Sequence, residues 1–132
     1  MNPAYPAVAE RANHRCEYCH APEAMFNVEF EVDHIVPRSR GGIDGEANWA
    51  LACRACNLRK SDCLDELDEP TGTEVPLFHP RQDSWESHFQ VDDDGTIGGI
   101  SATGRVTITR LAMNSMLQLS ARRQWIKLGL FP

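Results

Sequence analysis

Two cysteine motifs are the first residues in this chain whose type and spacing could do chemistry. One is the run CEYCH, Cys16 to His20, and the other is the run CRAC, Cys53 to Cys56. A CxxCH run matches the signature for covalent attachment of a c-type haem, and it would also serve as half of a zinc site. The second run is unexplained in a haem protein, whereas two CxxC motifs supply the four thiolates of a tetrahedral structural zinc site. We therefore expect Zn²⁺ held by Cys16, Cys19, Cys53 and Cys56, with a Cys3His site that uses His20 as a minor alternative.

The N-terminus indicates the environment of these thiols. Its run MNPAYPAVAERANHR has no continuous apolar stretch, so we expect neither a signal peptide nor a membrane span. A cytoplasmic location follows as an expectation, and in that reducing environment paired CxxC motifs favour a metal over disulfides. The segment that contains both motifs is too small to bury a large core, and a structural zinc contributes about 10–16 kcal/mol of apparent binding free energy to such folds.

A second set of polar residues lies between the motifs and just after them. The run EVDHIVPRSRGG precedes a central asparagine, and another asparagine follows the last cysteine of the CRAC motif. In this order the residues resemble the HNH endonuclease family over residues 11–62, in its four-cysteine, zinc-containing form with asparagine at the third signature position. The chain is similar to small stand-alone HNH proteins of bacterial or phage type. The matching residues are Asp33, His34, Pro37, Gly41, Gly42, Asn48 and Asn57.

The resemblance implies a ββα-metal fold and a hydrolase that cleaves phosphodiester bonds of nucleic acid, usually DNA, with a divalent cation. An imidazole with its ordinary pKa near 6.5 suits a general base, so His34 is expected to activate the attacking water. Mg²⁺ and Mn²⁺ prefer oxygen ligands, which Asp33 and Asn57 both offer. Asn48 is expected to orient the imidazole of His34, as residues behind a catalytic group commonly do.

Charge along the chain is uneven. The formal net charge is −6, yet acidic residues concentrate between residues 62 and 94, and only basic ones follow residue 95. Basic residues near the motifs would contact phosphates and give affinity without sequence choice. The alternative is that they are solubilising surface charge. The expected partner is duplex DNA, with RNA as the alternative substrate, and the candidate phosphate contacts are Arg38, Arg40, Arg54, Arg59 and Lys60.

Periodicity predicts the elements that position these groups. Residues 26–32 alternate apolar and polar and predict a half-buried strand, and a second strand is expected at residues 49–52. Neighbouring side chains on a regular strand point to opposite faces, so the first strand must bend or end near His34 if Asp33 and His34 are to serve one phosphate. A strand that ran straight through would make His34 a core residue. Residues 57–69 predict a helix that ends at Pro70.

The C-terminal half is predicted to be a separate extension. Residues 70–86 are typical of a linker, and the run HFQVDDDGTIGGI predicts a hairpin with its turn at Asp94-Gly95. The last thirty residues predict two helices, with an apolar stripe at Leu117, Ala121, Trp125 and Leu128. We expect the α+β class: a zinc-stabilised ββα-metal core in residues 1–69, and in residues 70–132 a linker, hairpin and basic two-helix extension packed on it.

Two other classes of function remain as alternatives. A non-catalytic zinc module that binds nucleic acid or protein would need the four cysteines, but it would not need Asp33-His34 with Asn48 and Asn57. A c-type cytochrome would be coloured on purification. The sequence contains no legible dimer interface, so it does not predict an oligomeric state.

Overall fold

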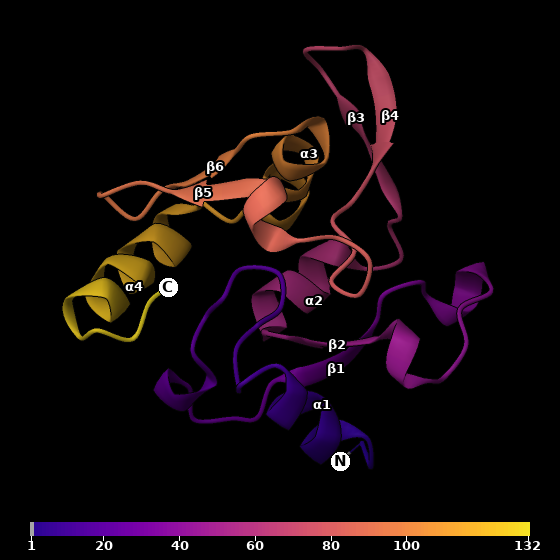
Figure 1. The fold of residues 1–132 in the computed structure, drawn as a ribbon, viewed down its shortest axis with the longest axis horizontal. Helices are drawn as coiled ribbons and strands as arrows, with labels where there is room; N and C mark the ends of the chain where they lie inside the picture. Colours follow the sequence, from indigo (N-terminus) through magenta and orange to yellow (C-terminus); the bar gives the residue numbers. More distant parts are fainter. Residues whose placement is uncertain (1) are drawn as a thin grey trace.

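The structure is a computed structural model that describes residues 2–132 (Figure 1). Over these residues it is a mixture of helices and antiparallel strand pairs, which confirms the expected α+β class. The helices are α1 (Tyr5–Arg11), α2 (Arg54–Lys60), α3 (Ala102–Leu111) and α4 (Met116–Lys127). The strands pair as β1 (Glu31–His34) with β2 (Trp49–Ala52), β3 (Asp65–Asp68) with β4 (Thr73–Pro76), and β5 (Phe89–Val91) with β6 (Ile97–Gly99).

Strands β1 and β2 with helix α2 form a ββα unit. The register places Asp33 opposite Ala50 and His34 opposite Trp49, and α2 begins directly after β2. The prediction for β2 is confirmed. The prediction of a strand over residues 26–32 is wrong for its first part, because the buried carboxylate of Glu23 accepts a hydrogen bond from the backbone N–H of Phe30 and holds residues 26–30 as a loop.

The helix predicted over residues 57–69 is also wrong beyond its first turn. Helix α2 ends at Lys60, and the chain then forms the β3–β4 hairpin. Asp68 is 1% exposed because Arg105 on α3 donates to both of its carboxylate oxygens, while Leu67 is 49% exposed. The helix prediction assumed that Leu67 would be buried and that the acidic residues beside it would be exposed, and the structure shows the reverse for Leu67 and Asp68.

The hairpin β5–β6 and the two C-terminal helices confirm the predicted elements of the extension, but the buried face of α4 differs from the predicted stripe. Leu117 is 84% exposed, whereas Arg122 is fully buried beside Trp125. The guanidinium of Arg122 donates to the backbone carbonyls of Gly95 and Met113 and lies over the ring of Phe131. These acceptors compensate its burial in part, and the sequence pattern could not anticipate them.

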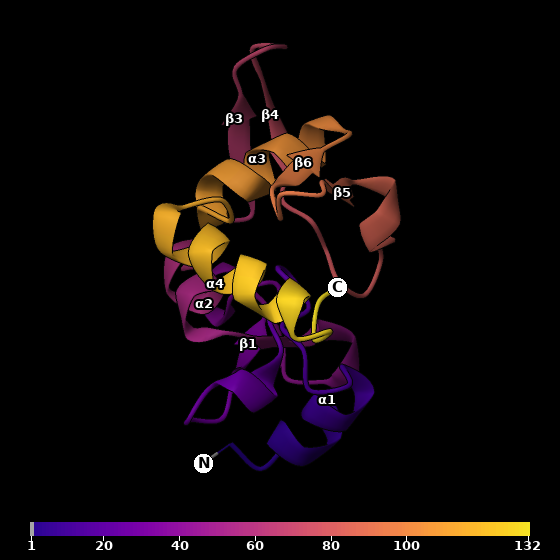
Figure 2. The same cartoon turned by 90° about the vertical axis from the view of Figure 1, so that its left-hand side faces the viewer.

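The elements are stacked around α2. In both views α2 lies between the β1–β2 pair and α3, and the β3–β4 hairpin projects at the end of the molecule opposite α1 (Figures 1 and 2). The guanidinium of Arg59 on α2 contacts the last carbonyls of α3 at Leu111 and Ala112. The expected boundary between residues 69 and 70 falls in the turn of the β3–β4 hairpin, and the linker predicted over residues 70–86 is wrong at its start, because residues 73–76 form β4 and pair with β3.

Candidate metal centre and active site

The four cysteines of the two CxxC motifs meet in the interior. Their sulfur atoms lie within 4.8 Å of one another, and the sulfurs of Cys19 and Cys53 are 3.8 Å apart. Four sulfurs at the usual Zn–S distance of about 2.3 Å in a tetrahedron are separated by about 3.8 Å. Cys53 is also the N-cap of α2, where its sulfur accepts from the backbone N–H of Cys56. The cluster therefore fits a structural zinc ion that joins the first motif to the start of α2.

The electrostatics of the cluster also favour a bound cation. The Cys16 side chain, followed by Cys19 and Cys56, stabilises the thiolate of Cys53 and lowers its pKa. Hydrogen bonding with Cys16 is the main cause that raises the pKa of both Cys19 and Cys56. Four buried thiols at this distance cannot all ionise unless a cation shares their charge, and zinc ligands must be deprotonated.

His20 lies outside this cluster. Its ring stacks on Trp85 with the ring centroids 4.1 Å apart, and burial lowers the pKa of its imidazole. The structure therefore supports the four-cysteine set, with His20 as a neighbour that packs against the C-terminal half.

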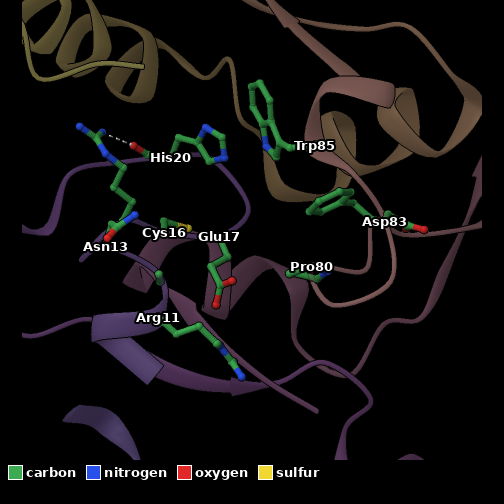
Figure 3. Close-up of a pocket in the computed structure, with 11 residues that line it drawn as sticks. Arg11, Asn13, Cys16, Glu17, His20, Pro80, Asp83 and Trp85 are labelled. Carbon is green, nitrogen blue, oxygen red and sulfur yellow. Dashed lines mark hydrogen bonds between the residues drawn. The ribbon is translucent and has the colours of Figure 1, made fainter. Parts of the chain in front are cut away.

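A pocket of about 330 Å³ opens beside the first cysteine motif (Figure 3). Arg11, Glu17 and His20 line one side, and Asp83 and Trp85 lie across from them. Its charged groups already have partners: Glu17 pairs with Arg81, and Arg11 donates to the backbone carbonyl of Trp49. The indole N–H of Trp85 donates to the carbonyl of Tyr18. The pocket therefore lies at the interface where residues 78–85 pack against the first cysteine motif.

Asp33 is held from behind by two buried groups. It is 6% exposed, and the hydroxyl of Tyr18 donates to its Oδ2 over 2.7 Å. The ammonium group of Lys60 lies 3.3 Å from the same oxygen. Burial raises the pKa of Asp33, an effect that Lys60 and the Tyr18 hydroxyl oppose. Both contacts fall on Oδ2, and within residues 2–132 no hydrogen bond to Oδ1 is present, which leaves that atom for a cation.

Asn57 lies on α2, against the same side of β1. Its amide nitrogen donates to Oε2 of Glu31, two residues before Asp33 on the strand. The other carboxylate oxygen of Glu31 pairs with Arg54. Since the amide nitrogen faces Glu31, the carbonyl oxygen of Asn57 is the atom left to bind a cation. Two oxygen donors on facing elements suit a hard cation such as Mg²⁺ or Mn²⁺.

His34 is the last residue of β1, where the chain leaves the strand. Its side chain is 23% exposed, and Nε2 lies 2.7 Å from Oδ1 of Asp44. Arg38 donates to both carboxylate oxygens of Asp44. His34 is therefore not a core histidine, and the strand ends at this residue, as we expect if Asp33 and His34 are to serve one phosphate.

Asn48 contacts the loop after β1 rather than the imidazole of His34. Its Oδ1 accepts from the backbone N–H of Val36, and its amide nitrogen donates to the carbonyls of Val36 and Ile43. Its backbone carbonyl accepts from the N–H of Ile35. Asn48 thus fixes the backbone on both sides of the loop, and any effect on His34 is transmitted through that loop.

The candidate phosphate contacts lie in two different environments. Lys60 is 2% exposed, and its ammonium group contacts Asp33 and the carbonyl of His34, so it does not face a phosphate. The arginines at positions 38, 40, 54 and 59 are exposed. The sequence predicts an exposed Lys60, because no local pattern distinguishes it from its neighbour Arg59.

Three residues at this site were missed from the sequence: Tyr18, Glu31 and Asp44. Glu31 could have been found, because it is two residues before Asp33 on one strand and side chains at that spacing share a face. Tyr18 has no such signal, because its partner Asp33 lies on another element. Asp44 has none either, because its contact with His34 depends on the conformation of the loop after β1.

Comparison with known proteins agrees with this geometry. Residues 16–62 match the family described as HNH endonuclease. No curated protein and no solved structure matches the chain. Among residues 2–132, no helix is both long and apolar enough to cross a membrane.

Proposed function

We propose that the chain hydrolyses phosphodiester bonds of DNA, because residues 16–62 match the HNH endonuclease family. In this proposal His34 is the general base, and Asp33 and Asn57 hold one divalent cation. The observation that carries it is the position of His34 at the end of β1, partly exposed, with its imidazole held by Asp44. A general base for a bulky substrate must be accessible and oriented. A buried imidazole would not be accessible, and an imidazole without a hydrogen-bond partner would not be oriented.

The residues divide the work of hydrolysis. His34 takes the proton of the attacking water as the new bond to phosphorus forms. Asp33, through Oδ1, and Asn57, through its carbonyl oxygen, would hold Mg²⁺ or Mn²⁺, which stabilises charge on the phosphate and the leaving oxygen when bound. Tyr18 and Lys60 hold the carboxylate of Asp33 in place. Asn48 holds the loop that follows His34.

Duplex DNA is the proposed substrate and the cytoplasm the proposed location. Exposed arginines lie on the elements that carry the candidate site: Arg38 and Arg40 follow β1, while Arg54 and Arg59 lie on α2. Such contacts to phosphates would give affinity that falls as salt rises, without choice of sequence. We propose these four arginines as the phosphate contacts and leave Lys60 out of the set.

The test is a cleavage assay on supercoiled plasmid in Mg²⁺ and in Mn²⁺, with protein shown to carry one zinc per chain. His34→Ala should lower the cleavage rate by about 10²- to 10⁴-fold and leave zinc content and melting temperature unchanged. His14→Ala is the matched control, because it alters an exposed imidazole outside residues 16–62, and it should cleave normally although it removes the ion pair of His14 with Glu23.

Two results would contradict the proposal. Unfolding of His34→Ala would show that the residue belongs to the core. Absence of cleavage by the zinc-loaded parent protein in both ions would favour a non-catalytic zinc module.

A further inference from the structure

The contact between His34 and Asp44 determines where the imidazole proton lies. A carboxylate can only accept a hydrogen bond, so the 2.7 Å contact requires Nε2 of His34 to be the donor. Arg38 Nε is also near Nε2, but at 3.5 Å that contact is too long to compete. With the proton on Nε2, a neutral imidazole has its lone pair on Nδ1. Within residues 2–132 Nδ1 has no hydrogen-bond partner, so it is the atom that can accept a proton from water.

The loop after β1 is built to bring Asp44 back to His34. Gly42 makes this return possible, because a Cβ there would lie 1.7 Å from the carbonyl oxygen of Val36. The amide of Asn48 then bridges the carbonyls of Val36 and Ile43, which fixes the residue directly before Asp44. Arg38 contacts both oxygens of Asp44 at 2.7 Å and sets the plane of the carboxylate. Each of these contacts is short and local to the loop.

We propose that Asp44 is the positioning residue of the general base, and this inference rests on the proposed function. Asp44 accepts from Nε2–H of His34, fixes that tautomer and directs Nδ1 towards the water. In the step that follows, an O–H bond of water breaks and its proton goes to Nδ1. The water oxygen forms a bond to phosphorus, and the P–O bond to the leaving oxygen breaks with its electron pair remaining on that oxygen. Asp44 remains ionised and takes no proton. The same arrangement explains how Asn48 influences His34 without touching its ring, since Asn48 fixes the loop that carries Asp44.

The first test measures cleavage kinetics of the full chain on a duplex oligonucleotide. Asp44→Ala should lower kcat by about 10- to 100-fold with little change in KM, because orientation of the base matters mainly in the transition state. Asp44→Asn retains an acceptor oxygen without the charge and should fall between Asp44→Ala and the parent. Asp93→Asn changes the charge equally at an exposed residue in the β5–β6 turn and should match the parent. An unchanged kcat in Asp44→Ala would overturn the inference while leaving the proposed function intact.

The second test needs no activity and therefore separates this inference from the proposed function. In ¹⁵N-labelled protein without substrate, at a pH where imidazole is neutral, the ring nitrogens of His34 report the tautomer directly. The parent and Asp93→Asn should show the proton on Nε2, and Asp44→Ala should show a mixture of tautomers. A proton on Nδ1 in the parent, or the same tautomer in Asp44→Ala, would overturn the inference even if the chain cleaves DNA.

Discussion

The cysteine cluster and the candidate active site use neighbouring residues, but their side chains are arranged differently. In the cluster four side chains, each at most 2% exposed, converge on one point within 4.8 Å. At the candidate active site each principal residue has a different partner: Asp33 contacts Lys60, His34 contacts Asp44, and Asn57 contacts Glu31. Structural metal sites are closed, whereas catalytic sites keep a position open. The cysteine cluster, called the closed site below, is therefore complete by itself. The candidate active site, called the open site, depends on the partner residues that hold Asp33, His34 and Asn57 in place.

Tyr18 and α2 connect the two regions. Tyr18 lies inside the first CxxC motif, and its hydroxyl donates to Asp33. Helix α2 begins at the cysteine motif, carries Asn57 one residue after Cys56, and ends at Lys60 beneath Asp33. Loss of the closed site should therefore also disorder the open one, whereas damage to the open site should leave the closed one intact.

The largest expected effect comes from breaking the closed site. Cys53→Ser removes a zinc ligand and the N-cap of α2, so the protein should lose zinc and most of the roughly 10–16 kcal/mol that such an ion contributes. Zinc content per chain and thermal unfolding followed by circular dichroism measure both losses. Cys63→Ser is the matched control, because Cys63 lies outside the cluster and should keep zinc and stability. A folded, zinc-loaded Cys53→Ser protein would show that the cluster does not depend on four ligands.

A smaller effect is expected from Lys60→Met, which leaves the carboxylate of Asp33 buried without its cationic partner. Removing one member of a buried pair typically costs about 3–5 kcal/mol, so urea unfolding should show a lower free energy of unfolding with zinc retained. Arg54→Met breaks the exposed pair with Glu31, in which Arg54 is 71% exposed, and should cost less than about 1 kcal/mol.

This pair of variants also sharpens the assignment of the basic residues. If Lys60 contacted phosphate instead of Asp33, Lys60→Met would leave stability unchanged and would reduce the salt dependence of DNA binding. The structure predicts the reverse, with the salt dependence reduced by Arg54→Met.

The sequence predicted the closed site almost completely and the open site only in part. Thiolate spacing is a local property, so two CxxC motifs were enough to identify the four ligands, and the cluster agrees with them. The second strand, the β5–β6 hairpin and the two C-terminal helices were also predicted, because each carries its own turn or periodicity signal. The presence of Asp33, His34 and Asn57 at the end of β1 and on α2 followed from the family resemblance.

The remaining features depend on contacts between residues that are distant in the chain. Asp68 is buried because Arg105 reaches it from α3, so the β3–β4 hairpin was mistaken for a helix. Arg122 is buried because backbone carbonyls from two turns accept hydrogen bonds from its guanidinium, so the buried face of α4 was mistaken as well. Lys60 was assigned to the surface for the same reason, since its partner Asp33 lies on another element. A single sequence carries no signal for such partners.

An effect smaller than that of Lys60→Met, and the sharpest test of how the open site is held, is expected from Asn48. Its amide nitrogen donates to two carbonyls, of Val36 and Ile43, so Asn48→Asp would place an oxygen against two oxygens. Asn48→Ala leaves buried backbone groups without partners and should lower the free energy of unfolding by about 1–3 kcal/mol. Asn48→Asp should lower it by at least as much. Urea unfolding and plasmid cleavage should rank both variants in the order parent, Asn48→Ala, Asn48→Asp. Were Asn48 instead to orient the imidazole through its side-chain oxygen, Asn48→Asp would keep that acceptor and outperform Asn48→Ala. The order of the two variants therefore decides whether Asn48 acts on the loop that carries Asp44 or on the ring of His34 directly.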